Sequence, residues 1–444
     1  MEATHSLIDM QMNANMWIAG MTLIAAYVLI FSEVIHRTNA AIIGAVFMIG
    51  IGTWKGFYSQ ADAVMALDAN TMFLLMGMMM VVVLLRPTGG FEYLAIKISK
   101  FAGNSQIVLL VSLSSAVSII SMFLDNVTTV LIFAPLTVVI AKILSINPLP
   151  YLMSEAMLSN IGGASTLVGD PPNIMIGSSA GLDFMSFLVH MGPIVMVIWF
   201  CTVGMVLYTF RKELALQPTG TVDLDETKAI TDPEGLAKAM FALTVVIILF
   251  FVHHYFHLYP SYVAFIGVAI AVALMRPDPE PLFGKVEWSV LAFFAGLFII
   301  VGGVEHSGLL DLIGLKLSSM ASDPESLLMT CILLMWVAAF ASAIVDNIPF
   351  TVTMIPIVHG LETQGINVFP LWWALAIGVG LGGNGSHIGA TANVICVAES
   401  EKSGIPEARI TPILWIKKGL PIMLFSLVVA SLVYAMTFEY FRTP

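Results

Sequence analysis

Long apolar runs, separated by short polar segments, make up most of this chain. The clearest of them carry no charged residue and are Met16–Phe31, Ala40–Ile51, Met72–Leu85, Met240–Val252 and Val263–Met275. A helix needs about 20 mostly apolar residues to cross roughly 30 Å of hydrocarbon. The pattern therefore predicts membrane-spanning helices near residues 16–32, 39–54, 71–85, 187–210, 239–256, 260–275, 289–304 and 412–436.

Two longer apolar stretches, 105–145 and 325–365, are broken near their centres by polar residues. The first holds the sequence Asp125–Thr129, and the second holds Asp346-Asn347. Each stretch fits two interpretations. It forms either two full spans joined outside the membrane or a re-entrant hairpin whose tip lies at mid-depth.

Two other apolar stretches, 152–180 and 370–396, contain glycine pairs. In the first, Pro171-Pro172 removes backbone donors and prevents a continuous helix. Both stretches are therefore expected to be interrupted helices. By contrast, Phe91–Ala102 mixes charged and apolar residues, which predicts an amphipathic helix at the membrane interface.

The chain matches itself at a nearly constant offset of 219–221 residues. The matching positions are Gly77 with Gly296, Gly89 with Gly308, Asp125 with Asp346, Pro135 with Pro356 and residues 162–173 with 382–393. Duplicated halves with broken segments at corresponding places are typical of secondary transporters. We predict a first repeat over 1–210, a cytoplasmic linker over 211–238 that is rich in acidic residues, proline and glycine, and a second repeat over 239–444.

Lysine and arginine placement indicates how the chain is oriented. With the N-terminus outside, only Lys55, Lys316 and Arg442 fall on the outer side, and the other fifteen basic residues fall inside. Positive residues collect on the cytoplasmic side. The linker is then cytoplasmic and both termini lie on the outer side of the plasma membrane, which in bacteria is the inner membrane. Five crossings per repeat make the two repeats inverted. The predicted fold class is an all-α polytopic membrane protein.

Composition excludes several other classes of protein. Charged residues make up 11% of the chain and hydrophobic residues 58%, whereas a soluble domain has about 25% charged residues. No basic face is present for nucleic acid. Cys201, Cys331 and Cys396 stand at unrelated spacings, which predicts neither a disulfide framework nor a metal site. The sequence has neither the metalloprotease motif His-Glu-x-x-His nor a serine–histidine pair with a helical arrangement that suggests catalysis, so we expect no enzyme activity and no cofactor.

Three carboxylates lie in the apolar stretches, where the free-energy cost of a charge has to be compensated. A charged residue at mid-helix costs about 2.5–3.5 kcal/mol on insertion scales. Asp125, Asp346 and Asp170 lie where helices are expected to end, so backbone groups without partners are nearby. Such groups and the carboxylates together can face a solute. We therefore interpret these positions as functional.

The segments FLDNVTTVLIFAP, SNIGGASTLVGDPPNI, SAIVDNIPFTVTMIP and LGGNGSHIGATANVI resemble the signature segments of the ArsB/NhaD branch of the ion transporter superfamily. They are most similar to the subgroup of the melanosomal P protein and its bacterial arsenite-permease-like relatives. The resemblance implies paired re-entrant hairpins, interrupted helices, and a mobile part that moves like an elevator against a scaffold. It also implies a central ion and solute site, formed by Asp125, Asn126, Thr128, Asp346, Asn347 and Thr351 at the hairpin tips and by Gly163, Ser165, Thr166, Asp170, Asn173, Gly383, Asn384, Ser386, Thr391 and Asn393 in the interrupted helices.

The two repeats differ at the site in ways that bear on coupling. Asp170 is matched by Ala390, and Leu167 is matched by His387. We therefore assign proton coupling first to Asp170, with Asp125, Asp346 and His387 as further candidates. Aspartates at the hairpin tips disfavour a multiply charged anion, and they suit a proton, a metal cation or a neutral hydroxylated solute such as arsenous acid.

The function that we expect is secondary active efflux of arsenite or antimonite in exchange for protons. A sodium/proton antiporter is the alternative, and an anion pathway of the P-protein type is less favoured. The expected partners are the solute, protons and the lipid bilayer. A homodimer and a cytoplasmic ATPase partner are left open by the sequence. We expect the rings of His253, His254 and His257 to be solvated at the membrane interface. We expect Glu305-His306 to form an exposed helix end.

Overall fold

The computed structural model describes residues 12–32, 34–216, 218, 220, 225–318 and 324–443, and within them it contains helices and no strand. The first half contains α2 (Ala14–Ser32), α3 (Arg37–Lys55), α4 (Gln60–Met65), α5 (Ala69–Leu85), α6 (Gly90–Ala102), α7 (Gln106–Ser121), α8 (Asn126–Leu144), α9 (Leu149–Gly163), α10 (Pro171–Ala180), α11 (Phe184–Thr209) and α12 (Arg211–Leu214). The second half contains α13 (Pro233–Val252), α14 (Pro260–Met275), α15 (Pro279–Gly284), α16 (Trp288–His306), α17 (Leu309–Ser318), α18 (Pro324–Val345), α19 (Asn347–Glu362), α20 (Phe369–Gly382), α21 (Thr391–Lys402) and α22 (Pro412–Met436). The predicted all-α class is confirmed.

Seven helices of the described chain are long and apolar enough to cross a membrane. They are Ala69–Thr88, Asn126–Leu144, Phe184–Thr209, Pro233–Phe256, Trp288–His306, Ser326–Ile344 and Pro412–Met436. Three shorter apolar helices, Ala14–Ile30, Gln106–Ser121 and Pro260–Met275, accompany them. The polytopic membrane architecture expected from the apolar runs is therefore present, although α3, at the predicted span 39–54, is not among these helices.

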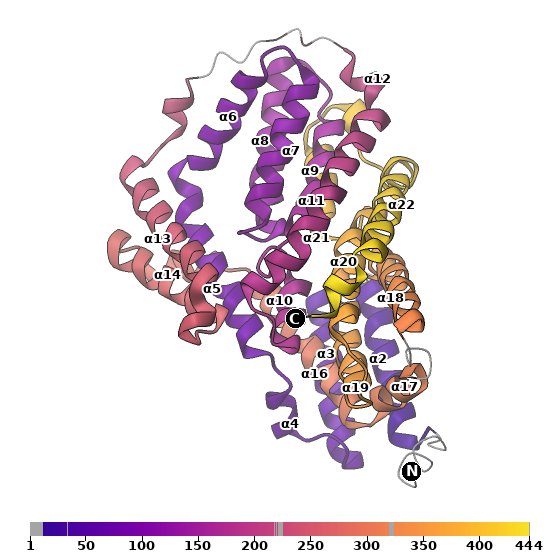
Figure 1. Ribbon diagram of the computed structural model, residues 1–444. Coiled ribbons are helices and arrows are strands. Elements are labelled where there is room, and N and C mark those ends of the chain that lie inside the picture. Colours follow the sequence, from indigo (N-terminus) through magenta and orange to yellow (C-terminus); the bar gives the residue numbers. More distant parts are fainter. Residues whose placement is uncertain are drawn as a thin grey trace.

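The helices pack in a few closely associated sets. α3 packs on α2 and α16, and α14 packs on α5 and α13. The central set contains the hairpins and interrupted helices, in which α7 packs on α9, α18 on α20, α8 on α21 and α11 on α22. Figure 1 shows α5, α13 and α14 along one side of the molecule and α2, α3 and α16 towards the end that carries the N-terminus.

Two helical hairpins approach each other from opposite ends of the molecule. In Figure 1 the α7–α8 hairpin extends towards the end that carries α12, whereas α19 extends towards the end that carries α17. The turn between α7 and α8 is short, and the backbone N–H of Asn126 donates to the carbonyl of Gly169 in the break between α9 and α10, at 3.2 Å. Asp125, in the same turn, is 8% exposed. The tip of the first hairpin is therefore buried in the protein, which favours the re-entrant hairpin over two full spans joined outside.

Backbone conformations recur at matching positions of the two halves. Gly89, before α6, has a φ of +82°, and Gly308, before α17, has a φ of +80°. This left-handed region favours glycine, because a side chain would clash there. Asp170, at φ −146° and ψ 134°, and Ala390, at φ −147° and ψ 146°, each precede the second half of an interrupted helix. At these two pairs the sequence matches mark positions of equal conformation.

Paired glycines allow helix backbones to touch within each half. A Cβ atom on Gly162 of α9 would lie 2.4 Å from the carbonyl oxygen of Ser118 on α7. A Cβ atom on Gly382 of α20 would lie 2.4 Å from the carbonyl oxygen of Ala339 on α18. Small residues permit this close approach between membrane helices. The hairpins are thereby held tightly against the interrupted helices.

The linker is shorter than the sequence suggested. We expected the segment Pro233–Gly235 to belong to a linker that ends at residue 238, but α13 begins at Pro233. Proline is favoured at the first helical position because the N–H that it lacks has no helical partner there. Asp232 caps the helix by accepting a hydrogen bond from the N–H of Gly235 at 2.8 Å.

The amphipathic segment after α5 is helical, as predicted. Its buried residues are Phe91, Ala95, Ser99 and Ala102, which lie on the face that packs against α7 and α8. Lys100 forms an ion pair with Glu226, which lies in the 3₁₀-helix Glu226–Ala229 of the linker. This helix therefore links the hairpin to the linker, and its position at the membrane interface stays a prediction.

We predict that Gly162→Ala and Gly382→Ala each lower the melting temperature of the protein purified in detergent. The added methyl group overlaps a backbone carbonyl, and overpacking costs about 1–3 kcal/mol. The matched control is Gly50→Ala in α3, because nothing lies within 4 Å of its Cβ position. Melting temperatures for Gly162→Ala and Gly382→Ala equal to that of the Gly50→Ala control would contradict the close backbone packing.

Candidate functional site

Asp170 lies at the centre of the molecule with a carboxylate that its own helix does not use. It stands at the N-cap of α10, where aspartate ordinarily accepts hydrogen bonds from the first backbone N–H groups. Pro171 and Pro172 occupy the first two positions, and the Asp170 side chain makes no capping bond. The residue is 1% exposed. The N–H of Asn173, the next position, donates to the Asp170 backbone carbonyl at 3.0 Å, so the buried carboxylate faces other elements.

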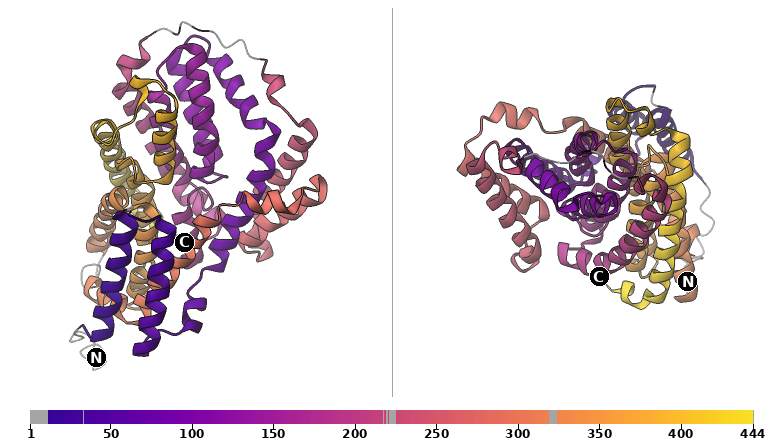
Figure 2. Two further views of the ribbon diagram at one scale, coloured as in Figure 1. Left: turned by 180° about the vertical axis from the view of Figure 1, so that it is seen from behind. Right: turned by 90° about the horizontal axis from the view of Figure 1, so that it is seen from above.

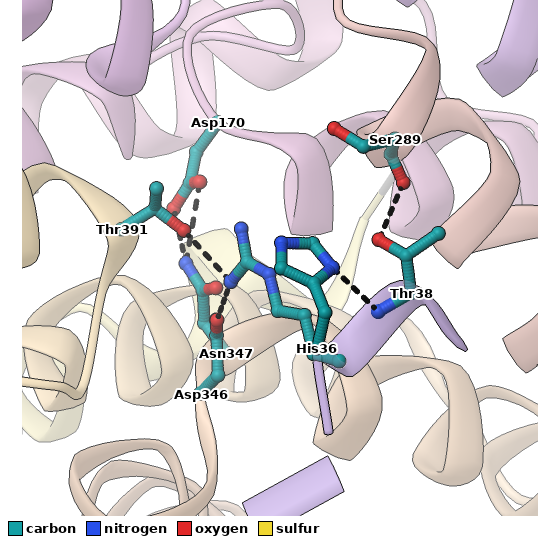
Figure 3. A network of polar contacts seen from close by, with 8 residues as sticks. His36, Thr38, Asp170, Ser289, Asp346, Asn347 and Thr391 are labelled. Carbon is teal, nitrogen blue, oxygen red and sulfur yellow. Dashed lines mark hydrogen bonds and ion pairs between the residues drawn. The ribbon is translucent and has the colours of Figure 1, made fainter. Parts of the chain in front are cut away.

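The two hairpin tips supply the hydrogen bonds to this carboxylate. Asn126 Nδ2 donates to Asp170 Oδ1 at 3.4 Å. Asn347 Nδ2 lies 3.3 Å from both carboxylate oxygens, as Figure 3 shows. No ion pair joins Asp170 to a basic side chain among the residues that the structure describes. Charges at membrane depth are usually paired, so neutral amides in the place of a cation make this carboxylate suited to take up a proton or a cation.

Asparagine side chains continue from Asp170 into the second interrupted helix. Asn126 Nδ2 also donates to Asn160 Oδ1 at 2.9 Å, and Asn160 Nδ2 donates to Asn384 Oδ1 at 2.9 Å and to Asn393 Oδ1 at 3.2 Å. An ionised carboxylate only accepts hydrogen bonds. It thus fixes which end of the Asn126 amide points towards it, and each amide then fixes the next. One carboxylate orients polar groups of both repeats.

Matching asparagines brace the open backbone of the two breaks. Asn173 Nδ2 donates to the carbonyls of Gly163 and Thr166 at 3.2 and 2.9 Å. Asn393 makes the same two bonds in the second break, at 2.7 and 2.8 Å. Both asparagine side chains are buried. Their amide hydrogens are used to hold the loops, and only the side-chain oxygen of Asn393 joins the central network.

The two hairpin tips use their aspartates differently. Asp125 caps α8, because its carboxylate accepts from the N–H and the hydroxyl of Thr128 at 2.8 and 2.6 Å. Asp346 precedes α19 but makes no side-chain cap, and its φ is +77°. Pro349 stands where the first repeat has Thr128, so neither the N–H nor the hydroxyl is present. The Asp346 carboxylate is thereby left for an ion pair with Arg37.

Arg37 joins the second hairpin tip to the first turn of α3. Its Nη1 donates to Asp346 Oδ2 at 3.0 Å and to Thr391 Oγ1 at 3.1 Å. A cavity of about 440 Å³ lies beside this contact, and its polar lining is formed by His36, Arg37, Asp346 and Thr391. The remaining lining is apolar. The cavity is large enough for a small solute next to the charged pair.

Two buried acceptors at this site have no hydrogen-bond partner in the described part of the chain. They are Asn126 Oδ1 and Asp346 Oδ1. A buried polar atom without a partner costs about 1–3 kcal/mol. A bound species that donates hydrogen bonds, or a cation, would satisfy both atoms. An anion would not.

Several expected site residues bond to backbone carbonyls of the hairpins and breaks. The Thr351 hydroxyl donates to the Asn347 carbonyl one turn earlier at 2.8 Å, and the hydroxyls of Ser165 and Thr166 donate to the carbonyls of Gly162 and Met122. We therefore place these three residues among the supports of the site.

The remaining expected residues lie in the two breaks. Gly163 packs against Gly169, because a Cβ atom on Gly163 would lie 2.5 Å from the Gly169 carbonyl oxygen. Ser386 contributes its carbonyl to the second break, and its hydroxyl accepts from Ile388 N–H at 3.3 Å. His387 is half-buried in the same break.

Sequence reasoning missed three polar residues. Asn160, which connects the repeats, lies two residues before a glycine pair in an otherwise apolar run. From the sequence, Arg37 was only one of the basic residues that indicate which side of the chain faces the cytoplasm. Glu155 of α9 is 0% exposed, and one of its oxygens accepts from the Thr137 hydroxyl. The rule that singled out the aspartates, a polar residue inside a predicted span, would also have found Asn160 and Glu155.

The histidine cluster near the end of α13 corrects one expectation. His253 is 5% exposed and does not have the solvated ring that we expected. Its Nε2 accepts from the Phe184 N–H at 3.3 Å, and its Nδ1 lies 2.7 Å from the Leu258 carbonyl, because the 3₁₀ turn His253–Phe256 folds the ring against the start of α11. His254 is largely exposed, and Glu305-His306 form an exposed helix end, as expected. No group of three metal-ligating side chains occurs among the described residues.

Comparisons with known proteins agree with a transporter. The family model described as a citrate transporter matches residues 27–378. The chain is 36% identical to the 46 kDa membrane protein of Mycobacterium leprae, over 94% of this chain and 97% of that protein. It is 37% identical to an uncharacterized transporter of Mycobacterium tuberculosis, over 88% of this chain and 92% of that protein. It is 30% identical to the human P protein, over 90% of this chain and 58% of that protein.

A solved structure has the same fold. It is that of the YdaH transporter of Alcanivorax borkumensis, which has a TM-score of 0.60 at 13% identity and covers 89% of this chain and 88% of that one. At this identity the likeness concerns the fold alone. The comparisons confirm an integral membrane transporter and the expected similarity to the P protein. The finer assignment to the ArsB/NhaD branch stays a prediction.

We predict that Asn160→Ala lowers the melting temperature of the detergent-purified protein. The change leaves the side-chain oxygens of Asn384 and Asn393 without their shared donor, and each buried unpaired group costs about 1–3 kcal/mol. The control is Gln364→Ala, an exposed amide at the end of α19 that water can replace. Equal melting temperatures for the two variants would show that the amide network does not hold the repeats together.

Proposed function

This chain belongs to the citrate transporter family, and on that premise we propose that it is a secondary transporter that exchanges protons for a small solute at Asp170. The proposal includes a mobile part, formed by the hairpins and interrupted helices, that moves against the remaining helices. It also places the chain in the plasma membrane, which in bacteria is the inner membrane, with the linker in the cytoplasm and both termini outside. Each half then acts as one of two inverted repeats.

The observation that carries the proposal is the arrangement of polar groups around Asp170. Its buried carboxylate is bound by amides from both hairpin tips, and its neighbours Asn126 Oδ1 and Asp346 Oδ1 are acceptors without a partner. A proton, a cation or a hydroxylated neutral solute supplies what these atoms lack. Because both hairpin tips contact Asp170, a change in its protonation alters both at once. A ligand shifts a conformational equilibrium only through unequal binding to the two states.

We propose arsenite or antimonite as the solute, in the neutral trihydroxy form. Three hydroxyl groups donate to carboxylate and amide oxygens, and the oxygen atoms accept from the asparagine amides. Citrate, which the family description mentions, carries several negative charges, and three aspartates with a single arginine disfavour it. An anion pathway of the P-protein type is disfavoured for the same reason.

A sodium/proton antiporter is the second candidate, and one observation favours it. Asp125, Asp170 and Asp346 together provide more negative charge than Arg37 balances. Hard cations prefer oxygen ligands such as carboxylates and amide carbonyls. A sodium ion at Asp170 would therefore replace the proton directly.

The deciding experiment is flux in proteoliposomes that contain the purified full-length protein. Arsenite, antimonite, sodium, chloride and citrate are supplied one at a time, with an imposed pH gradient. We expect arsenite or antimonite movement that depends on the gradient. Sodium movement with no arsenite movement would support the second candidate, and chloride or citrate movement alone would overturn the proposal.

We predict that Asp170→Asn retains solute counterflow and loses flux driven by a pH gradient. Asparagine has the size of the protonated acid, so solute binding is kept, but it cannot release a proton. Both activities are measured in the same proteoliposomes across a pH series. Asp225→Asn, in the linker 3₁₀ turn, is the control and should retain both. If gradient-driven flux survives in Asp170→Asn, proton coupling belongs to Asp125, Asp346 or His387 instead.

We predict that replacing Cys201, Cys331 and Cys396 together by alanine leaves most arsenite flux intact. All three are free cysteines, and Cys331 and Cys396 are buried. Our proposal handles arsenic through oxygen atoms, so no thiolate is required. The measurement is arsenite counterflow by the triple variant at wild-type protein density. Loss of counterflow in well-folded protein would contradict an oxygen-only site.

A further inference from the structure

The contact between Arg37 and the second hairpin tip joins α3 to the central set, beside the packing of α16 on α19 and the hydrogen bond from the Tyr27 hydroxyl of α2 to the Pro349 carbonyl. Arg37 is the first residue of α3, which packs on α2 and α16. Asp346 and Thr391 stand at the starts of α19 and α21, in the central set that holds Asp170. One guanidinium nitrogen contacts both side chains, at 3.0 and 3.1 Å. Movement of the central set relative to α3 requires that these two bonds break.

The backbone at Asp346 is held in an unfavourable conformation. Its φ of +77° and ψ of 146° lie in a region that is essentially restricted to glycine, and such residues persist only where their surroundings hold them, at a cost of about 1–3 kcal/mol. Asp125 at the equivalent position has a φ of −63°. Asp346 therefore carries backbone strain that Asp125 does not, at the residue that holds Arg37.

The ion pair also connects the cavity to the Asp170 centre. The cavity of about 440 Å³ is lined by Arg37, Asp346 and Thr391, and Asp170 is not part of its lining. Asn347, which follows Asp346, lies 3.3 Å from both carboxylate oxygens of Asp170, as Figure 3 shows. The Arg37–Asp346 pair therefore stands at the cavity wall, one residue from the hairpin-tip amide that binds Asp170.

A first contact for the solute is already present at the pair. Asp346 Oδ1 is buried and has no hydrogen-bond partner in the described part of the chain. A species with donors or positive charge can bind this oxygen while Oδ2 still holds Arg37. It then competes with the guanidinium for the same carboxylate.

We infer that the Arg37–Asp346 ion pair is the gate between the cavity and the Asp170 centre, and that Arg37 determines which solutes pass. The inference rests on the proposed transport through Asp170. The arginine neutralises Asp346 and thereby keeps the entry suited to neutral hydroxylated solutes. Its removal leaves a second uncompensated carboxylate near Asp170, which favours cations.

Solvent access behind the gate tests this inference without reference to any solute. The reporter is Asn347→Cys, a 5% exposed position, in full-length protein whose native cysteines are alanine. A small water-soluble maleimide is applied in detergent. We expect Arg37→Gln to raise the alkylation rate by about tenfold or more, the factor expected when a hydrogen bond between charged groups is lost. Asp346→Asn breaks the same pair and should raise the rate similarly if Arg37→Gln does not fold.

Two variants serve as controls. Arg37→Lys keeps the charge and should keep the slow rate. Arg442→Gln breaks an exposed ion pair with Glu439 and should leave the rate unchanged. An unchanged rate in both Arg37→Gln and Asp346→Asn, or an equal rise in Arg442→Gln, overturns the gate.

Flux measurements test the selectivity that the gate imposes. In Arg37→Gln the ratio of sodium flux to arsenite flux should rise by about tenfold, by the same charge argument. An unchanged ratio overturns the role of Arg37 in selectivity. If the unsubstituted protein carries none of the solutes tested, the proposed function fails, whereas the alkylation rates still decide the gate.

Discussion

The contact of Asp170 with amides from both hairpin tips is the interaction on which the centre of this protein depends. Burial of a carboxylate at membrane depth costs several kcal/mol, about 2.5–3.5 on insertion scales. Each hydrogen bond to a charged group returns about 1.5–3 kcal/mol. Because one bond comes from Asn126 and two contacts come from Asn347, the two hairpins are held together through a single side chain. Its protonation therefore affects the stability of the whole arrangement.

The two repeats give this centre matching backbone segments. Differences between their side chains determine its chemistry. The two breaks share the backbone conformation of Asp170 and Ala390 and the braces formed by Asn173 and Asn393. The chemical differences are confined to a few side chains. Ala390 replaces Asp170, so one break is charged and the other neutral. Pro349 replaces Thr128, so one hairpin aspartate caps its helix and the other is left for Arg37. A symmetric scaffold thus carries an asymmetric site. Figure 2 shows the purple and magenta helices of the first half beside the orange and yellow helices of the second half.

Close backbone packing explains how so many polar groups remain at fixed distances. Gly162 and Gly382 let the interrupted helices touch their hairpins, and Gly163 and Gly389 let each break fold back on itself. Such contacts leave no room for water between the elements, so the polar atoms pair with one another. Asn126 Oδ1 and Asp346 Oδ1 are among the buried acceptors that stay unpaired in the described part of the chain, and a ligand that donates to them would lower the free energy.

The sequence by itself determined the membrane class, the spans, the duplication and most of the polar positions at the centre. These features depend on local rules: apolar length, glycine and proline at helix breaks, and the cost of a charge in hydrocarbon. It left open the choice between hairpins and full spans, because both give an even number of crossings. Only the tertiary structure favoured one of them, the hairpin, through the contact of Asn126 with Gly169.

The tertiary structure also decided which side chains meet. Arg37 and Asp346 are 309 residues apart, and Asn160 reaches Asn384 across the two repeats. No spacing rule connects such positions, because the distance between them is set by how the two halves pack. For the same reason Thr351, which the sequence placed at the site, bonds within its own helix, and His253, expected in solvent, is buried.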